Sequence, residues 1–284
     1  MKDLVPRLDP QSRTIIVQFI RERFDEAGAS TAIIGLSGGL DSALVLGLTV
    51  DALGKDRVKA FFLPYGDLGT RDREFAVLAS DVFGTNMEEI DITTMVDSVP
   101  FHLEGMAKGN VQARIRMTLL YAKSNLMNGL VVGTSNKTEL LLGYFTKYGD
   151  GGADIYPIGD LYKTQARTLA AEIGVPGEII EKPPSAGLVE GQTDEGELRA
   201  PYPVLDQVLF GHIRDVDPET IADSIDYTTT TVEEMDRAGF EPPITTEKVL
   251  QIIEAVKRSR HKRWSLAVPK VEMATVGIDL RERW

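Results

Sequence analysis

The sequence predicts an α/β fold with an open, mostly parallel twisted sheet of about four or five strands, helices on both faces and a helical C-terminal part. Short apolar runs rich in β-branched residues alternate with helical patterns between residues 31 and 181, as expected of successive β-α-β units. The first run ends in a glycine-rich turn that leads directly into a helical pattern. From residue 204 onward the recognisable patterns are helical.

The elements follow one another in a simple order. A first amphipathic helix begins near Pro10 and ends at Gly28. The predicted strands cover residues 31–36, 58–63, 87–92 and 130–133. The main helices cover 43–53, 108–127, 161–173, 204–210, 217–224, 230–237 and 245–260, and a further helix, with Thr70 as its N-cap, carries Phe75 to Val82 and is closed by Gly84. We expect a single domain over 1–284, made of an N-terminal helix (1–30), an α/β core (31–181), a lid loop (182–203) and a helical C-terminal part (204–284).

Composition limits the class of protein and its partners. The 284 residues are 43% apolar and 26% charged, which is ordinary for a globular chain. No apolar run approaches about 18 residues and Met1–Pro6 has no signal-peptide core, so we expect a cytoplasmic protein with no membrane partner. The lack of cysteine excludes disulfides, thiolate metal ligands and a cysteine nucleophile. The formal net charge of −12 argues against a nucleic-acid partner, which would favour a basic face.

The helix predicted over 108–127 is apolar around much of its girth. Val111, Ile115 and Leu119 form one line, which Met117 and Leu120 broaden. A helix of this kind requires burial on two sides. It is either a subunit interface or a central core helix, and the pattern does not choose between the two.

The turn after the first strand has the composition of an anion site. It reads Ser37-Gly38-Gly39-Leu40-Asp41-Ser42. Adjacent glycines let the backbone approach a ligand closely, and the first N–H groups of the following helix attract an anion. Asp41 would repel a phosphate unless a divalent metal ion lay between them. Because no lysine follows the glycines, this is not the common nucleoside-triphosphate loop; the plain alternative is an ordinary glycine-rich turn.

A second polar turn follows the fourth strand. Thr134–Glu139 opens a helix at the carboxyl end of that strand, the edge where ligands bind in open α/β sheets. We expect the two turns to face each other across one crevice. Lys163 lies in the first turn of the helix over 161–173, where cations are disfavoured, so it indicates either a nearby anion or a long exposed side chain.

Five stretches together resemble the NH3-dependent NAD synthetases, which belong to the ATP pyrophosphatases. They are Ser37–Ser42, Gly133–Glu139, Gly149–Asp154, Lys182–Ser185 and Glu190–Glu195, and their order and spacing fit over nearly the whole chain. The first stretch is shared by ATP pyrophosphatases in general, whereas the later ones are specific to NAD synthetases. The resemblance implies a Rossmann-like ATP pyrophosphatase fold and a homodimer, in agreement with the apolar helix over 108–127.

The resemblance also implies a reaction, the amidation of deamido-NAD that completes NAD biosynthesis. ATP adenylates the nicotinate carboxylate and releases pyrophosphate, and ammonia then attacks the adenylate to give NAD and AMP. Relatives that use glutamine carry a separate amidase domain with a cysteine nucleophile, and the roughly 30 residues before the first strand are too few for one. We therefore expect a C–N ligase that uses free ammonia, with ATP as co-substrate and Mg²⁺ as cofactor.

By the same resemblance, residues of several stretches hold ATP and its metal. The ATP-binding residues are Gly35, Leu36, Ser37, Gly38, Gly39, Leu40, Asp41, Ser42, Thr134, Lys163 and Ser185. Asp41 and Glu139 match the magnesium ligands of the family, and the ion would neutralise the polyphosphate. The residues to which we assign catalysis are Asp41, Lys163 and Asp154.

A second set of residues matches deamido-NAD contacts of the family: Arg114, Lys147, Asp154, His261 and Lys262. Arginine and lysine suit a pyrophosphate or a nicotinate carboxylate. Asp154 would accept hydrogen bonds from ribose hydroxyls or orient ammonia. The alternatives are an interface ion pair for Arg114, a favourable charge at a helix end for His261 and Lys262, and a turn cap for Asp154.

Two glycine- or proline-rich loops are placed to cover the site, and two other classes of protein would share parts of the sequence pattern. Because an acyl adenylate is labile in water, we expect the loops over 144–153 and 182–203 to be mobile in the empty enzyme and to order around substrates. A relative of GMP synthetase would share the first loop but not the stretches at 149–154 and 182–185. A non-catalytic nucleotide sensor, similar to the universal stress proteins, would not need Asp41 and Glu139 both facing the phosphates.

Overall fold

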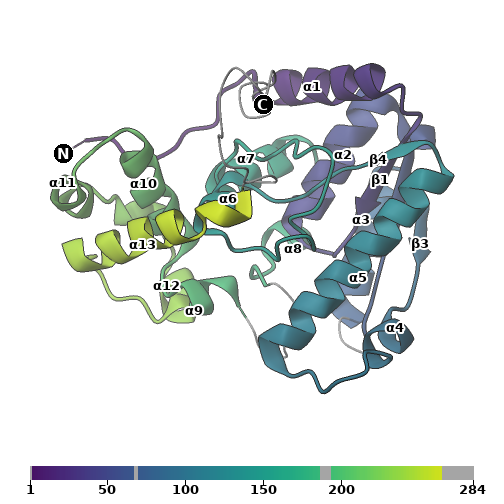
Figure 1. Ribbon diagram of the computed structural model, residues 1–284. Helices are drawn as coiled ribbons and strands as arrows, with labels where there is room; N and C mark the ends of the chain where they lie inside the picture. Colours follow the sequence, from purple (N-terminus) through teal and green to yellow (C-terminus); the bar gives the residue numbers. More distant parts are fainter. Residues whose placement is uncertain (1, 67–69, 186–192, 264–284) are drawn as a thin grey trace, which may run out of the picture.

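Four parallel strands form the central sheet of the protein, in the order β3-β2-β1-β4 (Figure 1). A computed structural model describes residues 2–66, 70–185 and 193–263 of the chain. The strands are β1 (Thr31–Gly35), β2 (Val58–Phe62), β3 (Met87–Glu89) and β4 (Gly129–Val131). The predicted parallel sheet is confirmed, although β3 and β4 are shorter than the sequence suggested.

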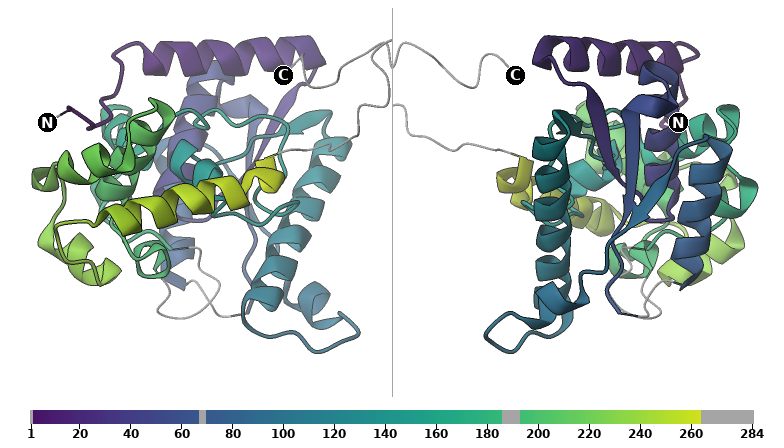
Figure 2. Two further views of the ribbon diagram at one scale, coloured as in Figure 1. Left: turned by 60° about the vertical axis from the view of Figure 1, so that its left-hand side comes forward. Right: turned by 90° about the vertical axis from the view of Figure 1, so that its right-hand side faces the viewer.

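Two sets of helices cover the two faces of this sheet. The helices of the α/β core are α1 (Ser12–Ala27), α2 (Leu40–Leu53), α3 (Thr70–Val82), α4 (Thr93–Asp97), α5 (Gly105–Leu126), α6 (Lys137–Leu142), α7 (Lys163–Glu172) and α8 (Gly177–Ile180), with the 3₁₀ helix η1 (Lys55–Arg57). The right-hand view of Figure 2 shows α5 on one side of the strands and α3 on the other. The expected helices on both faces are therefore confirmed.

Alternation along β1 explains how one short strand supports both layers. Ala32 and Ile34 belong to the core cluster that contains α2, whereas Ile33 belongs to the cluster packed against Ile115 and Leu119 of α5. Successive side chains of a strand point to opposite faces, so a continuous apolar run is what a strand buried on both faces needs. In the described chain α5 is thus a core helix on its sheet-facing side.

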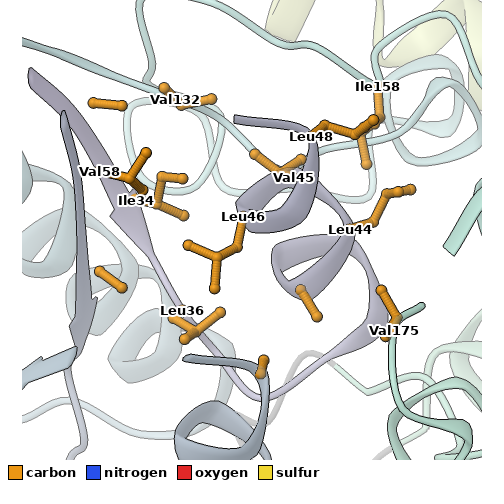
Figure 3. Packing of buried hydrophobic residues seen from close by; sticks show 14 of the residues in the cluster. Ile34, Leu36, Leu44, Val45, Leu46, Leu48, Val58, Val132, Ile158 and Val175 are labelled. Carbon is orange, nitrogen blue, oxygen red and sulfur yellow. The ribbon is translucent and has the colours of Figure 1, made fainter. Parts of the chain in front are cut away.

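Helix α2 is the most deeply buried helix of the core. Figure 3 shows Leu44, Leu46 and Leu48 packed between the strands and the segment that carries Ile158. A Cβ at Gly47 would lie 2.6 Å from the ring of Phe83, so a larger residue there would force that ring to move. The helix that follows the glycine-rich turn is therefore fixed in place along most of its length.

The chain crosses from one side of β1 to the other after β3. Because β1 pairs with β2 on one side and with β4 on the other, the strand order reverses at β1. The carboxyl ends of β1 and β4 consequently flank a topological switch point, where a crevice opens in this class of fold. The two polar turns identified in the sequence lie at that edge.

The C-terminal part has its own apolar core, and its helices lie beside the sheet in Figure 1. Its helices are α9 (Asp194–Leu198), α10 (Tyr202–Ile213), α11 (Pro218–Asp223), α12 (Val232–Ala238), α13 (Thr246–Arg258) and α14 (Arg260–Arg263), with the 3₁₀ helix η2 (Tyr227–Thr229). The helical C-terminal part is confirmed as far as Arg263, and residues 264–284 lie outside the described residues.

The prediction that residues 182–203 form a single lid loop is wrong in part. Its second half contains α9, and α10 begins before its end, at Tyr202. Residues 186–192 of that loop lie outside the described residues. In the part of the chain that the structure describes, no helix is long and apolar enough to cross a membrane.

Candidate active site

A large cavity opens at the carboxyl edge of the sheet. Its volume is about 1090 Å³, and its walls come from the turns after β1 and β4, from α5 and from the segment before residue 186. The predicted site residues that line it are Gly35, Leu36, Ser37, Gly39, Leu40, Asp41, Ser42, Thr134, Glu139, Lys163, Ser185 and Lys262. The structure therefore brings almost all of the expected ATP and metal residues to one place.

The turn after β1 leaves the start of α2 open to a ligand. Ser42 Oγ accepts from the Ser37 backbone N–H at 3.2 Å and donates to the Gly39 carbonyl at 3.0 Å, so Ser42 fixes the loop itself. The N-terminus of α2 carries no side-chain cap, so none of its N–H groups is held by a capping side chain. Uncapped N–H groups at the positive end of a helix bind an anion.

Gly38 is required by its surroundings. Its φ of +73° lies in the left-handed region, and a Cβ would collide with the backbone carbonyl oxygen of Asp72. Only glycine lets the loop approach α3 this closely. Gly38 itself does not line the cavity in the described part of the chain, in contrast to its neighbours.

The turn after β4 is held by a reciprocal cap. Asn136 Oδ1 accepts from the Glu139 N–H at 3.0 Å, and Glu139 Oε2 accepts from the Asn136 N–H at 3.2 Å. This capping box fixes the Glu139 carboxylate at the start of α6 and leaves its second oxygen toward the cavity. The two predicted turns thus face each other across the crevice, as the strand order implies.

Lys163 joins the two turns. Its Nζ donates to the carboxylate of Asp41 and to Glu139 Oε1 at 3.5 Å, and its side chain is only 7% exposed. Burial alone would lower the pKa of Lys163, but the charges of Asp41 and Glu139 outweigh it and raise that pKa. The anion that the sequence predicted beside this lysine is supplied, in the described chain, by two carboxylates of the protein.

A third carboxylate lies in the same cluster. Asp194, at the start of α9, is buried and accepts from the Tyr202 hydroxyl at 3.0 Å. Burial raises the pKa of Asp194, and the charge of Lys163 opposes this shift. The ammonium of Lys163 is therefore paired with two carboxyl groups and influenced by the charge of a third. Sequence analysis gave Asp194 no role of its own, although it stood in a stretch that carried the resemblance.

Asp206 supports the cluster from behind. It is fully buried on α10, accepts from the Thr138 hydroxyl at 2.5 Å and accepts from the Thr164 N–H at 2.8 Å. The Thr138 hydroxyl also accepts from the Lys163 N–H at 3.1 Å. One carboxylate of the C-terminal part thus fixes the starts of α6 and α7, which carry Glu139 and Lys163.

Three of the predicted deamido-NAD residues form a chain outside the cavity lining. Arg114 Nε donates to the Lys147 carbonyl at 3.3 Å, and Lys147 Nζ donates to the His261 carbonyl at 2.8 Å. Arg114 and His261 are exposed, and none of the three lines the cavity of the described chain. Lys262 does line it and donates to the carbonyls of Gly143 and Phe145 at 2.7 and 2.8 Å.

Asp154 also lies outside the lining of the described cavity, and it does not cap its own turn. Its Oδ2 accepts from the Val131 N–H at 2.7 Å, and its Oδ1 accepts from the Tyr121 hydroxyl at 3.1 Å. The turn-cap alternative is therefore wrong, because both partners belong to other elements, β4 and α5. The Asp154 carboxylate is hydrogen-bonded to the backbone at the end of β4.

Arg116 lines the cavity and was missed in the sequence. Its Nε donates to the Leu63 carbonyl, just beyond β2, at 2.8 Å. Burial lowers its pKa, with the nearby charge of Asp150 acting in the opposite direction. Arg116 lies two positions after Arg114, and positions two apart lie on different faces of a helix. Because α5 is apolar around much of its girth, periodicity did not show which arginine faces the cavity.

Comparison with known proteins agrees with this geometry. The family model for NAD synthase matches residues 13–265, which is most of the chain. The chain belongs to the NAD synthase family. The resemblance stated from the sequence is therefore confirmed.

Individual relatives of the NAD synthase family share both sequence and fold with the chain. An NH3-dependent NAD(+) synthetase from Methanosarcina acetivorans is 40% identical over 263 residues, 90% of this chain and 96% of the relative. The solved NMN synthetase from Francisella tularensis is 30% identical with a TM-score of 0.74, covering 91% of this chain and 97% of that one. An NH3-dependent NAD synthetase from Campylobacter jejuni is 26% identical with a TM-score of 0.71, with the same two coverages. The ATP pyrophosphatase fold predicted for the chain is thus confirmed.

Proposed function

We propose that the protein is an ATP-dependent ligase that amidates deamido-NAD to NAD with free ammonia, through a deamido-NAD adenylate, and releases AMP and pyrophosphate. Membership of the NAD synthase family and the NH3-dependent relatives support the reaction. The observation that carries it in the structure is the uncapped start of α2 within Ser37–Ser42, which carries Asp41 and faces Glu139 and Lys163 across one cavity. A nucleotide sensor does not require that convergence.

The leaving pyrophosphate would be held by the loop after β1. The first N–H groups of α2 and the hydroxyl of Ser37 would bind its oxygens, and Thr134, Lys163 and Ser185 would contact ATP from the other walls of the cavity. These groups stabilise charge and position reactants, so the protein needs no nucleophile of its own. The absence of cysteine from the whole sequence is consistent with this.

The acidic cluster fits the magnesium ion that this chemistry requires. Asp41, Glu139 and Asp194 lie beside the single ammonium of Lys163, and burial raises the pKa of Glu139 to about 8 and also raises the pKa of Asp194, so a bound cation would stabilise their ionised forms. Among the described residues no three acidic or histidine side chains are grouped closely enough to hold a metal ion alone. Asp41 and Glu139 would therefore bind Mg²⁺ together with phosphate oxygens, which is its usual mode. When bound, the ion neutralises the polyphosphate and stabilises the leaving group.

The nicotinate end of the substrate would lie toward α5 and α14. Lys262 lines the cavity there, and Arg114, Lys147 and His261 form the hydrogen-bonded chain outside its lining. We assign deamido-NAD binding to this group, with Asp154 behind it at the end of β4. Asp154 would orient ammonia or ribose hydroxyls with the acceptor lone pairs that remain on its two oxygens beside the hydrogen bonds from Tyr121 and Val131.

A second candidate substrate is the smaller nicotinate mononucleotide. It is favoured by one observation, the 30% identity and TM-score of 0.74 to a protein named NMN synthetase. The same adenylation and amidation would then give NMN. The two substrates share the nicotinate carboxylate, but only deamido-NAD carries the AMP half of the dinucleotide. Their kcat/KM values therefore separate the candidates.

The assembly and location remain predictions. We expect a homodimer formed along α5, because Met106 and Leu126 near its two ends are 68% and 81% exposed in the described chain. We also expect the protein to act in the cytoplasm, with no membrane and no nucleic acid among its partners.

The deciding experiment supplies purified protein with ATP, Mg²⁺, ammonium and either deamido-NAD or nicotinate mononucleotide. We expect NAD, AMP and pyrophosphate in equal amounts, with deamido-NAD the better substrate by kcat/KM. Formation of ADP instead of AMP would refute the reaction. A higher kcat/KM for the mononucleotide would replace the substrate and keep the chemistry.

A further inference from the structure

Lys182 donates a hydrogen bond to the backbone of the loop after β1. Its Nζ donates to the Gly38 carbonyl at 3.2 Å and to the carboxylate of Asp72 in the first turn of α3. The same ammonium lies 5.6 Å from the centre of the Phe75 ring. Its side chain is 21% exposed and lines the cavity. Lys182 stands in one of the stretches that carry the family resemblance, but no role has been assigned to its side chain.

The other two lysines that line the cavity have side-chain or backbone partners of their own in the described chain. Lys163 is bound by Asp41 and Glu139, and Lys262 donates to the carbonyls of Gly143 and Phe145. The loop after β1 contains no lysine of the kind that other nucleoside-triphosphate loops use. A polyphosphate bound there therefore lacks a cation from the loop itself, and Lys182 is placed to supply one.

The partner of Lys182 points to the same role. Asp72 is a carboxylate next to an anion site, where its charge would repel phosphate. Its ion pair with Lys182 cancels that repulsion and keeps the ammonium beside the loop. The long, flexible stem of lysine lets the ammonium leave the carboxylate when a more highly charged anion arrives.

We propose that Lys182 binds the β- and γ-phosphates of ATP and the pyrophosphate released from them, and that Asp72 holds its ammonium at the loop between turnovers. This inference rests on the proposed function, because it assigns a further group to the same leaving anion. It differs from a purely structural role, in which the Lys182–Asp72 pair only braces the loop against α3.

The test is calorimetric binding of inorganic pyrophosphate with Mg²⁺ to the full chain, together with the KM for ATP. Lys182→Met is expected to weaken pyrophosphate binding and to raise the KM for ATP by about tenfold to a hundredfold, the range for a hydrogen bond between charged groups. Lys182→Arg should recover most of the binding because it keeps the charge. Lys257→Met, on the exposed end of α13, is the control for loss of a lysine and should match the wild type.

The Asp72→Asn variant distinguishes phosphate binding by Lys182 from a purely structural role of the Lys182–Asp72 pair. If Lys182 binds phosphate, this variant binds pyrophosphate as tightly as the wild type or more tightly, since a competing carboxylate is gone. A loss equal to that of Lys182→Met would show that the pair is only a brace and would overturn the proposal, as would unchanged binding in Lys182→Met. Should Lys182→Met fail to fold, Lys182→Gln and Asp72→Asn give the same decision. Wild-type protein that forms no NAD would instead refute the proposed function.

Discussion

Replacing Asp206 by asparagine tests how the helical C-terminal part supports the charged side chains of the active site. The carboxylate is fully buried and accepts from the Thr138 hydroxyl and from the Thr164 N–H. Asparagine has nearly the same shape and keeps one acceptor oxygen, while its amide can donate to the Thr138 oxygen. The substitution therefore removes a buried charge with little change in packing.

The magnitude follows from the pKa of the buried carboxyl. Burial raises the pKa of Asp206 from 3.8 to about 6, although the hydrogen bonds from Thr138 and Thr164 act in the opposite direction. The pKa of Asp206 is higher in the folded state than in the unfolded state, so the protonated carboxyl favours folding. This contribution to the free energy of unfolding is fully present below about pH 4 and is lost as the pH rises through about 6. The gap between the two values corresponds to about 3 kcal/mol of unfolding free energy.

Urea unfolding of the wild type and of Asp206→Asn at pH 4 and pH 7 measures this quantity. We expect the free energy of unfolding of the variant, relative to the wild type, to rise by about 2 to 3 kcal/mol between the two pH values. Asp223→Asn, on the exposed end of α11, controls for the loss of one carboxylate elsewhere in the same part. An identical difference at both pH values would show that Asp206 does not titrate in this range, and the argument would fail.

Two further predictions concern the walls of the cavity. Gly38→Ala should lower kcat by more than about a hundredfold, because a Cβ there collides with the Asp72 carbonyl and displaces the N–H groups that hold the leaving group. Gly28→Ala is the matched control: it has a similar φ of +61° and open space around it, so it should cost about 1 kcal/mol of stability and leave kcat unchanged. Arg116→Met should raise the KM of a nucleotide substrate at least about tenfold with little change in melting temperature, whereas the exposed Arg73→Met should not, and equal KM values for these two variants would remove Arg116 from the site.

Sequence patterns predicted the α/β core because local composition alone specifies it. The run of β1 is rich in β-branched residues and that of β2 in apolar and aromatic ones, both typical of strands, and glycines mark the ends of α1 and α2. The loop after β1 and the turn after β4 were identified for the same reason, since each places glycine or polar groups directly after an apolar strand. Strand order then brought them together without any further information from the sequence.

The parts that sequence reasoning missed depend on contacts between distant residues. Helix α9 has no apolar periodicity, and its buried residues are acidic. Glu195 is completely buried because Arg237, far along the chain, pairs with it at 2.9 Å and the Tyr202 N–H donates to it at 3.2 Å. Buried charges are found only when their partners are known, so a stretch of this composition looks like an exposed loop.

The arrangement of the cluster explains why the C-terminal part belongs to the active site and is not an appendage. Asp41 comes from the first strand–helix turn, Glu139 and Lys163 come from α6 and α7, and Asp194 comes from α9. Asp206 fixes the starts of α6 and α7 from inside the C-terminal core, and Tyr202 of the same helix holds Asp194. Loosening α10 therefore separates the ammonium of Lys163 from its carboxylates while the sheet and its loop stay intact. Destabilisation of the C-terminal part should for this reason abolish turnover before it unfolds the α/β core.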